Sequence, residues 1–209
     1  MHSEVLVIAC GALAREVAEL KRSHGWGHLR LKCLDPLLHN TPHAIPGAVR
    51  DAIRAGRAEF EHLFVAYADC GTGGALDRVL ESEGVERLPG AHCYEFLAGA
   101  KRFAGLADAE PGTFYLTDFL ARNFDRLVIR PLGLDTNPEL CDAYFGNYTR
   151  LVYLSQTLDA NLADAARDAA GRLALEYEHV HCGLDAREST MTEQVLRWGG
   201  DQEDFRVLA

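Results

Sequence analysis

The sequence lacks any apolar run that is long enough to cross a bilayer. A membrane-spanning helix needs roughly 20 apolar residues, whereas the run near the N-terminus covers only Val5 to Ala9. That run is also too short for the core of a signal peptide, and no basic segment precedes it. We therefore expect a cytoplasmic protein with no membrane partner.

Basic residues are also fewer than acidic ones. The chain has 21 Lys and Arg residues against 31 Asp and Glu residues, which gives a formal net charge of -10. Such a surface repels polyphosphate backbones unless a local basic patch intervenes, and the sequence shows no run of basic residues. We therefore expect no nucleic-acid partner.

The six cysteines include no C-x-x-C pair. They stand at positions 10, 33, 70, 93, 141 and 182, too dispersed for a small disulfide scaffold, and a cytosolic chain keeps its thiols reduced. Packing, metal binding or catalysis must account for each of them.

The first half of the chain alternates buried strands with helices. Strands are predicted at Val5–Ala9, His28–Leu34, Leu63–Tyr67 and Gly84–Leu88, and helices at 12–24, 48–55, 75–83 and from about residue 91. This alternation is typical of a Rossmann-like α/β three-layer sandwich with a mostly parallel sheet. The carboxyl ends of the strands then share one edge, where such sheets bind ligands.

The second half has a different pattern. Helical spacing covers Thr113 to Arg130, Asn137 to Arg150 and Thr157 to Leu173, and strands are predicted at Leu151–Leu154 and Leu175–His181. A chain of 209 residues fits within one domain. We expect a single domain over residues 1–209, with the tail from about 190 as peripheral decoration.

Three cysteines follow predicted strands at the ligand-binding edge, namely Cys10, Cys70 and Cys93. Thiolates are the soft ligands that zinc and iron–sulfur clusters take. Three ligands without a fourth leave one metal position open to substrate. Free cysteines are also common as small buried residues, and packing is the alternative for these three and the favoured explanation for Cys33, Cys141 and Cys182.

The segment Gly71-Thr72-Gly73-Gly74 lies between a predicted strand and a helix. Its backbone N–H groups and the helix dipole point to contact with an anionic substrate group. The segment matches no phosphate-binding motif, so a tight turn capped by Thr72 or Asp69 is the alternative.

Asp69, His39 and Glu95 are the titratable residues expected at the same edge. Burial there would tune them for acid–base catalysis. The alternatives are a helix cap for Asp69, a loop hydrogen bond for His39 and a helix-dipole contact for Glu95.

Six segments together carry a family resemblance. The chain resembles the family called domain of unknown function 1638 up to about residue 184, through ACGALAREV at 9–17, LLHNTP at 37–42, VAYADCGTGGALD at 65–77, GAHCYEFLAG at 90–99, EPGTFYLTDFL at 110–120 and YFGNYTRLVYLSQ at 144–156. The resemblance implies a setting beside corrinoid proteins and methyltransferases, and so a role in methylamine or betaine demethylation. It also carries Cys10, Cys70 and Cys93 over as candidate ligands.

The sequence thus predicts a three-cysteine metalloprotein that holds a [4Fe–4S] cluster, with zinc as the alternative. It would act on a small-molecule substrate in corrinoid-linked one-carbon metabolism. One alternative is a non-catalytic accessory protein that binds a corrinoid protein or methyltransferase. Another is a thiol enzyme with Cys70 as nucleophile. The sequence leaves open whether the protein forms a homo-oligomer.

Overall fold

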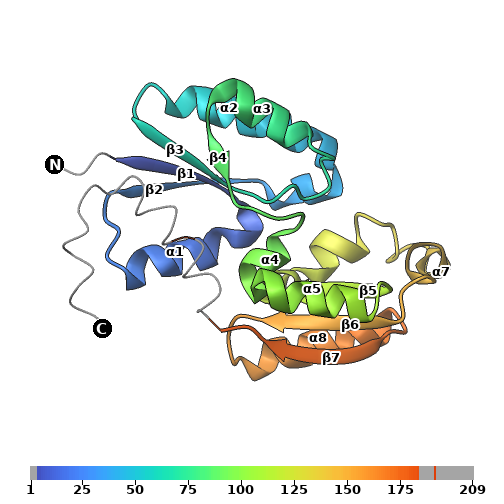
Figure 1. Ribbon diagram of the computed structural model, residues 1–209. Helices are drawn as coiled ribbons and strands as arrows, with labels where there is room; N and C mark the ends of the chain where they lie inside the picture. Colours follow the sequence, from blue (N-terminus) through green and yellow to red (C-terminus); the bar gives the residue numbers. More distant parts are fainter. Residues whose placement is uncertain (1–3, 184–190, 192–209) are drawn as a thin grey trace. The chain divides into compact units, whose positions relative to one another are not determined.

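The computed structural model describes residues 4–183 and residue 191 (Figure 1). Within these residues, contacts divide the chain after Phe96 into two compact units. We call them the N-terminal unit and the C-terminal unit. None of the helices in the described part has the length and apolar character that a membrane span requires.

The N-terminal unit contains a four-stranded parallel sheet in the order β2-β1-β3-β4. Its strands are β1 (Val5–Cys10), β2 (Leu29–Leu34), β3 (His62–Ala66) and β4 (Glu86–Arg87). Every residue of the central strand β1 is buried. A parallel strand covered on both faces has no polar side, which explains the continuous apolar run in the sequence.

Helices cover both faces of this sheet. Helix α1 (Ala14–Ser23) lies on one face, and α2 (Ile45–Gly56) and α3 (Ala75–Glu83) lie on the other (Figure 1). Helix α2 packs so closely that a Cβ at Gly56 would collide with a methyl carbon of Leu6. The unit is therefore a Rossmann-like three-layer α/β arrangement, as the sequence predicts.

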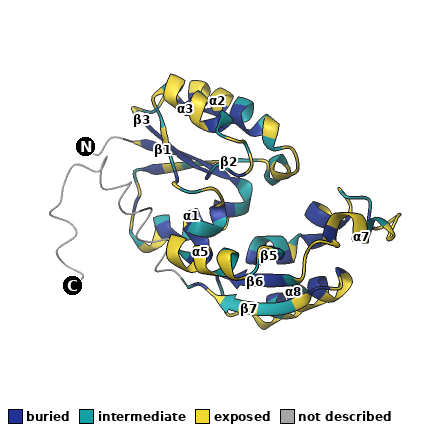
Figure 2. Cartoon of the chain, turned by 45° about the vertical axis from the view of Figure 1, so that its right-hand side comes forward, coloured by how far each residue is buried: buried dark blue, intermediate teal, exposed yellow. Residues whose placement is uncertain are grey.

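The C-terminal unit has its own parallel sheet, in the order β5-β6-β7. The strands are β5 (Thr113–Thr117), β6 (Arg150–Ser155) and β7 (Glu176–His181). Helices α5 (Ala100–Ala109) and α8 (Ala160–Arg172) lie on opposite faces, and the shorter helices are α6 (Asp118–Arg122) and α7 (Leu140–Phe145). The central strand β6 is buried along almost its whole length, whereas the edge strand β7 is partly exposed (Figure 2).

Two expectations need correction. The α/β class with parallel strands is confirmed, but the strands form two sheets instead of one. The helix predicted over residues 113–130 begins only at Asp118, because Thr113–Thr117 forms strand β5. The aromatic residues of that segment fit helical spacing, and a strand between two helical layers shows no alternation that would reveal it. The single domain over residues 1–209 stays a prediction, because two compact units can fold together.

The carboxylate of Asp118 joins β5 to β6 where both strands end. Asp118 is 1% exposed, and one oxygen accepts hydrogen bonds from the Tyr153 hydroxyl (2.7 Å) and the Gln156 backbone N–H (3.1 Å). The other oxygen accepts from the backbone and the hydroxyl of Thr157. Four donors thus satisfy one buried charge, which makes it costly to alter.

Replacement of this carboxylate by an amide should destabilise the fold. In Asp118→Asn, the amide NH₂ must face at least one existing donor, so we expect a loss of about 2–4 kcal/mol in the free energy of unfolding. Urea denaturation followed by circular dichroism measures it. The exposed Asp108→Asn control should change stability by less than about 0.5 kcal/mol, and equal effects of the two substitutions would contradict the assignment.

Candidate metal centre

Four residues gather at the carboxyl edge of the N-terminal sheet. Cys10 is the last residue of β1, Cys70 follows β3, and Cys93 is the first residue of α4 (Cys93–Ala98). His39 lies in a 3-10 helix, Pro36–Asn40, which follows β2. The parallel topology places these loops along one edge.

The closest group consists of His39, Cys70 and Cys93. One ring nitrogen of His39 and the two sulfurs all lie within 4.8 Å of one another. The two sulfurs are 3.1 Å apart, and both cysteines are buried. The Sγ atom of Cys10 lies 3.5 Å from His39 Nδ1, so Cys10 adjoins the group through the histidine.

The structure brings together residues that the sequence analysis names, but in a different arrangement from the expected three-cysteine set. Two of its three candidate ligands, Cys70 and Cys93, are in direct contact. The third donor is His39, which was expected to act in acid–base catalysis, and not Cys10. The signal in the sequence is its position directly after β2, at the same edge as the cysteines.

Backbone hydrogen bonds fix the relative positions of Cys70 and Cys93. The N–H of Asp69 donates to the carbonyl of Gly90 (3.2 Å), and the N–H of Cys70 donates to the carbonyl of Ala91 (2.9 Å). Cys70 itself has φ = 50°, a left-handed conformation that is unfavourable for a residue with a side chain. Such strained backbone is found most often at functional sites.

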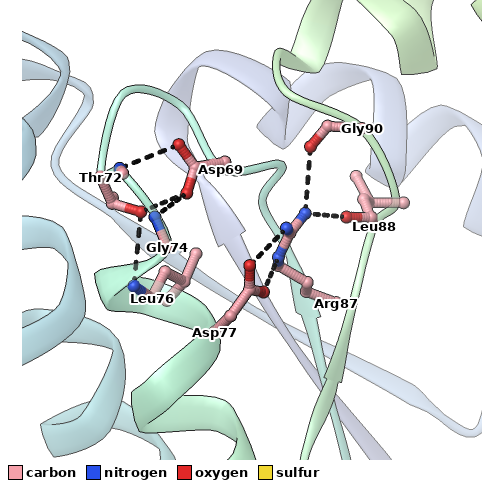
Figure 3. A network of polar contacts seen from close by, with 9 residues as sticks. Asp69, Thr72, Gly74, Leu76, Asp77, Arg87, Leu88 and Gly90 are labelled. Atoms are coloured by element: carbon pink, nitrogen blue, oxygen red, sulfur yellow. Dashed lines mark hydrogen bonds and ion pairs between the residues drawn. The ribbon is translucent and has the colours of Figure 1, made fainter.

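Asp69 stabilises the glycine-rich turn that follows Cys70 (Figure 3). Its carboxylate accepts hydrogen bonds from the Thr72 hydroxyl (2.6 Å) and from the backbone N–H groups of Gly73 (3.1 Å) and Gly74 (2.9 Å). The Thr72 hydrogen bond is the main reason that the pKa of Asp69 is lowered. The substrate contact expected for Gly71 to Gly74 stays a prediction, but the geometry favours the tight-turn alternative.

Arg87 holds the neighbouring loop in place, as Figure 3 shows. Its guanidinium forms an ion pair with Asp77, at 2.6 and 3.0 Å, and donates to the carbonyls of Leu88 (2.7 Å) and Gly90 (3.1 Å). This bidentate pairing stabilises the segment that leads from β4 toward Cys93.

Glu95 has a structural role at the start of α4. Its Oε1 atom accepts hydrogen bonds from the backbone N–H groups of Ala91 (2.7 Å) and His92 (3.4 Å). A carboxylate that accepts from two N–H groups at a helix start acts as a cap. The acid–base roles predicted for Glu95 and Asp69 stay predictions, and the contacts favour the capping alternatives.

The electrostatics of the cluster separate its two cysteines. The hydrogen bond from Cys93 and then the contact with His39 lower the pKa of Cys70 to about 5, despite burial. The pKa of Cys93 rises well above its usual value because of Cys70 and complete burial. His39 is exposed as a whole, and desolvation of its ring alone would lower its pKa, but hydrogen bonds with Cys10 and Cys70 raise it to about 10. These shifts favour Cys70 as the thiolate of the group and His39 as the cation beside it.

Tyr67 adds a buried phenol beside the thiols. It is 0% exposed, and its hydroxyl has no hydrogen-bond partner among the described residues. Burial raises its pKa strongly, and the adjoining Cys10 adds to this effect. Buried hydroxyl groups normally have a partner, so an unsatisfied one beside the cysteines fits a site that receives a further group.

The other cysteines lie outside this cluster. Cys33 is exposed on β2, whereas Cys141 is half-buried and Cys182 is buried in the C-terminal unit. His92, the neighbour of Cys93 in the sequence, is not part of the donor group.

The fold and the cluster together define a Rossmann-like α/β protein with a candidate metal centre at the carboxyl edge of its first sheet. The family described as Protein of unknown function (DUF1638) matches residues 33–191, three quarters of the chain. The chain belongs to this family. The matched span contains His39, Cys70 and Cys93 and begins after Cys10. Comparison with curated proteins and with solved structures yields no match.

The thiolate of Cys70 can be tested by titration of the metal-free protein. We expect ultraviolet thiolate absorbance to rise with a midpoint near pH 5, since a lowered pKa leaves the group deprotonated above that value. Cys70→Ser should abolish this transition, and Cys93→Ala should move it upward because the donor hydrogen bond is lost. Thiolate absorbance that develops only near pH 8.5, the range of a free thiol, would refute the assignment.

Proposed function

We propose that His39, Cys70 and Cys93 bind a single thiophilic metal ion, with zinc as the favoured ion, and that the protein uses it on a small-molecule substrate. The observation that carries this proposal is the convergence of three donor atoms within 4.8 Å at a ligand-binding edge. Two thiolates and one imidazole suit zinc, and catalytic zinc sites use three protein ligands with a fourth position open.

The distance between the sulfurs favours one ion over a cluster. With Zn–S bonds of about 2.3 Å and tetrahedral angles, two thiolates on one zinc lie about 3.8 Å apart. The Sγ atoms of Cys70 and Cys93 are 3.1 Å apart, so a small shift suffices. In a [4Fe–4S] cluster each cysteine binds a different iron, which requires these sulfurs to move much further from each other.

Cys10 and Tyr67 would then act around the metal. Cys10 lies within hydrogen-bond distance of His39 Nδ1, and a partner of this kind fixes the orientation and tautomer of a ligating histidine. The Tyr67 hydroxyl, which lacks a partner in the described residues, can donate to a group in the open position. A bound zinc supplies Lewis acidity and lowers the pKa of a water or thiol that it binds.

The corrinoid setting implied by the family resemblance suggests the substrate class. A zinc with two thiolates and an open position suits activation of a thiol or another small nucleophile for one-carbon transfer. A corrinoid protein or methyltransferase would be the partner that exchanges the carbon unit. The accessory-protein alternative keeps this partner but requires neither metal nor turnover.

The contact of the two sulfurs also favours a second candidate, a dithiol redox function. The low pKa of Cys70 makes it the attacking thiolate. Its attack on a low-molecular-weight disulfide would form a mixed disulfide with Cys70 and release one thiol. Cys93 would then attack the Cys70 sulfur and release the second thiol. The protein is left with a Cys70–Cys93 disulfide, and the two electrons are carried by the two thiols released.

Elemental analysis distinguishes these functions. We expect protein purified anaerobically to contain about one zinc per chain, and Cys70→Ser, Cys93→Ser and His39→Ala to lose most of it, since each removes one of three ligands. Cys141→Ser, in the C-terminal unit, is the matched control and should retain the metal. Iron with acid-labile sulfide and a brown colour would establish the [4Fe–4S] proposal in place of zinc.

If the folded wild-type protein contains no metal after anaerobic purification, both metal proposals are excluded and the dithiol and accessory functions remain. In that case, treatment with oxidised glutathione separates the two. A disulfide between Cys70 and Cys93, identified by peptide mass spectrometry, supports the dithiol function. Failure to form it supports the accessory role.

A further inference from the structure

Two adjoining hollows in the C-terminal unit lie outside the metal centre. The first has a volume of about 260 Å³, and four arginines contribute to its wall, Arg122, Arg126, Arg130 and Arg172. The second has a volume of about 400 Å³ and shares Arg130 and Arg172 with the first. Both sizes are in or near the range of small-molecule sites.

The first hollow has an excess of positive charge. Its four arginines face two carboxylates, Asp125 and Asp168, in a chain whose net charge is -10. Arg172 forms an ion pair with Asp125 at 2.7 Å. Among the described residues, Arg122, Arg126 and Arg130 form no ion pair. Three guanidinium groups thus share the hollow with the carboxylate of Asp168, to which none of them is ion-paired, and the hollow keeps a net positive charge.

The backbone beneath these arginines contains a π-helical turn. It spans Asp125–Ile129, and the N–H of Arg130 donates to the carbonyl of Asp125 at 2.9 Å. Such wide turns are rare and occur frequently at functional sites. This turn carries Arg126, and it lies between Arg122 at the end of α6 and Arg130, so that all three side chains reach the same hollow.

The position of Arg172 is fixed before any ligand binds. Its guanidinium contacts Asp125 on one side and lies 5.4 Å from the centroid of the Phe124 ring. A stacked, ion-paired arginine loses little conformational freedom when it binds a ligand. The wall that the two hollows share is therefore partly preorganised.

The second hollow has apolar and charged wall residues. Apolar or sulfur surface comes from Ile129, Leu134, Pro138, Cys141 and Leu173, and the charged residues are Asp125, Asp135, Arg130 and Arg172. Together the hollows form a basic compartment beside a partly apolar one, and they share Asp125, Arg130 and Arg172. This combination selects a ligand with an anionic group at one end and an apolar body at the other.

We infer that this pair of hollows binds a small molecule that bears a phosphate group on an apolar body. The phosphate lies among Arg122, Arg126 and Arg130, and the apolar part lies between the π-helical turn and Leu173. A phosphate matches several guanidinium groups better than a carboxylate does, because it has more acceptor oxygens and up to two charges. The site is concave and the chain is acidic overall, which favours a small molecule over nucleic acid.

Phenyl phosphate is a suitable probe, with inorganic phosphate and benzoate as comparisons. Isothermal titration calorimetry should show saturable binding of phenyl phosphate that is about tenfold tighter than that of either comparison, because each of them has only one of the two features. Arg126→Gln and Arg130→Gln should each weaken it by about tenfold, the effect of one charged hydrogen bond. Arg130→Lys keeps the charge and should have a smaller effect.

Lys101→Gln, an exposed basic residue on α5, is the matched control and should bind phenyl phosphate like the wild type. Cys70→Ser should also bind normally, so this result is independent of the metal centre. Circular dichroism verifies that each variant is folded. Absence of saturable binding, equal binding of phenyl phosphate and inorganic phosphate, or normal binding by both folded arginine variants would overturn the inference.

Discussion

The candidate metal centre depends on one short ladder of backbone hydrogen bonds beyond the end of the N-terminal sheet. Strand β4 has only two residues, so side-chain packing along it contributes little to the position of the loop that follows. The bonds from Asp69 and Cys70 to the carbonyls of Gly90 and Ala91 extend the pairing past β3 and β4. They bring the two sulfurs together although 23 residues separate them in sequence.

Most strands and helices of the N-terminal unit could be predicted from the sequence, because apolar runs and helical periodicity are local patterns. A continuous apolar run at Val5–Ala9 and a helix over Ala75–Glu83 follow from burial and periodicity alone. The parallel topology then requires strand ends to meet at one edge, which is why Cys10 and Cys70 could be placed near each other. The role of His39 could not be deduced, because the direction of a side chain in a 3-10 turn depends on contacts that periodicity does not encode.

The C-terminal unit was harder to predict because its first strand has no clear periodicity. Strand β5 carries aromatic residues and lies between two helical layers, so it shows neither alternation nor a purely apolar run. The arginines at 122, 126 and 130 are spaced by four and never adjacent, so they do not form a basic run in the sequence. Helical spacing brings these three to one face, but only the fold adds Arg172 of α8 and the hollow between them.

The carboxylate of Asp69 distinguishes this sheet edge from the nucleotide-binding edges found in other Rossmann-like proteins. In many α/β sheets a glycine-rich turn after a strand offers free N–H groups to a pyrophosphate. Here the chain supplies its own anion to the equivalent groups of Gly73 and Gly74. An incoming nucleotide would have to displace this carboxylate, which already occupies the N–H groups that its phosphates would need.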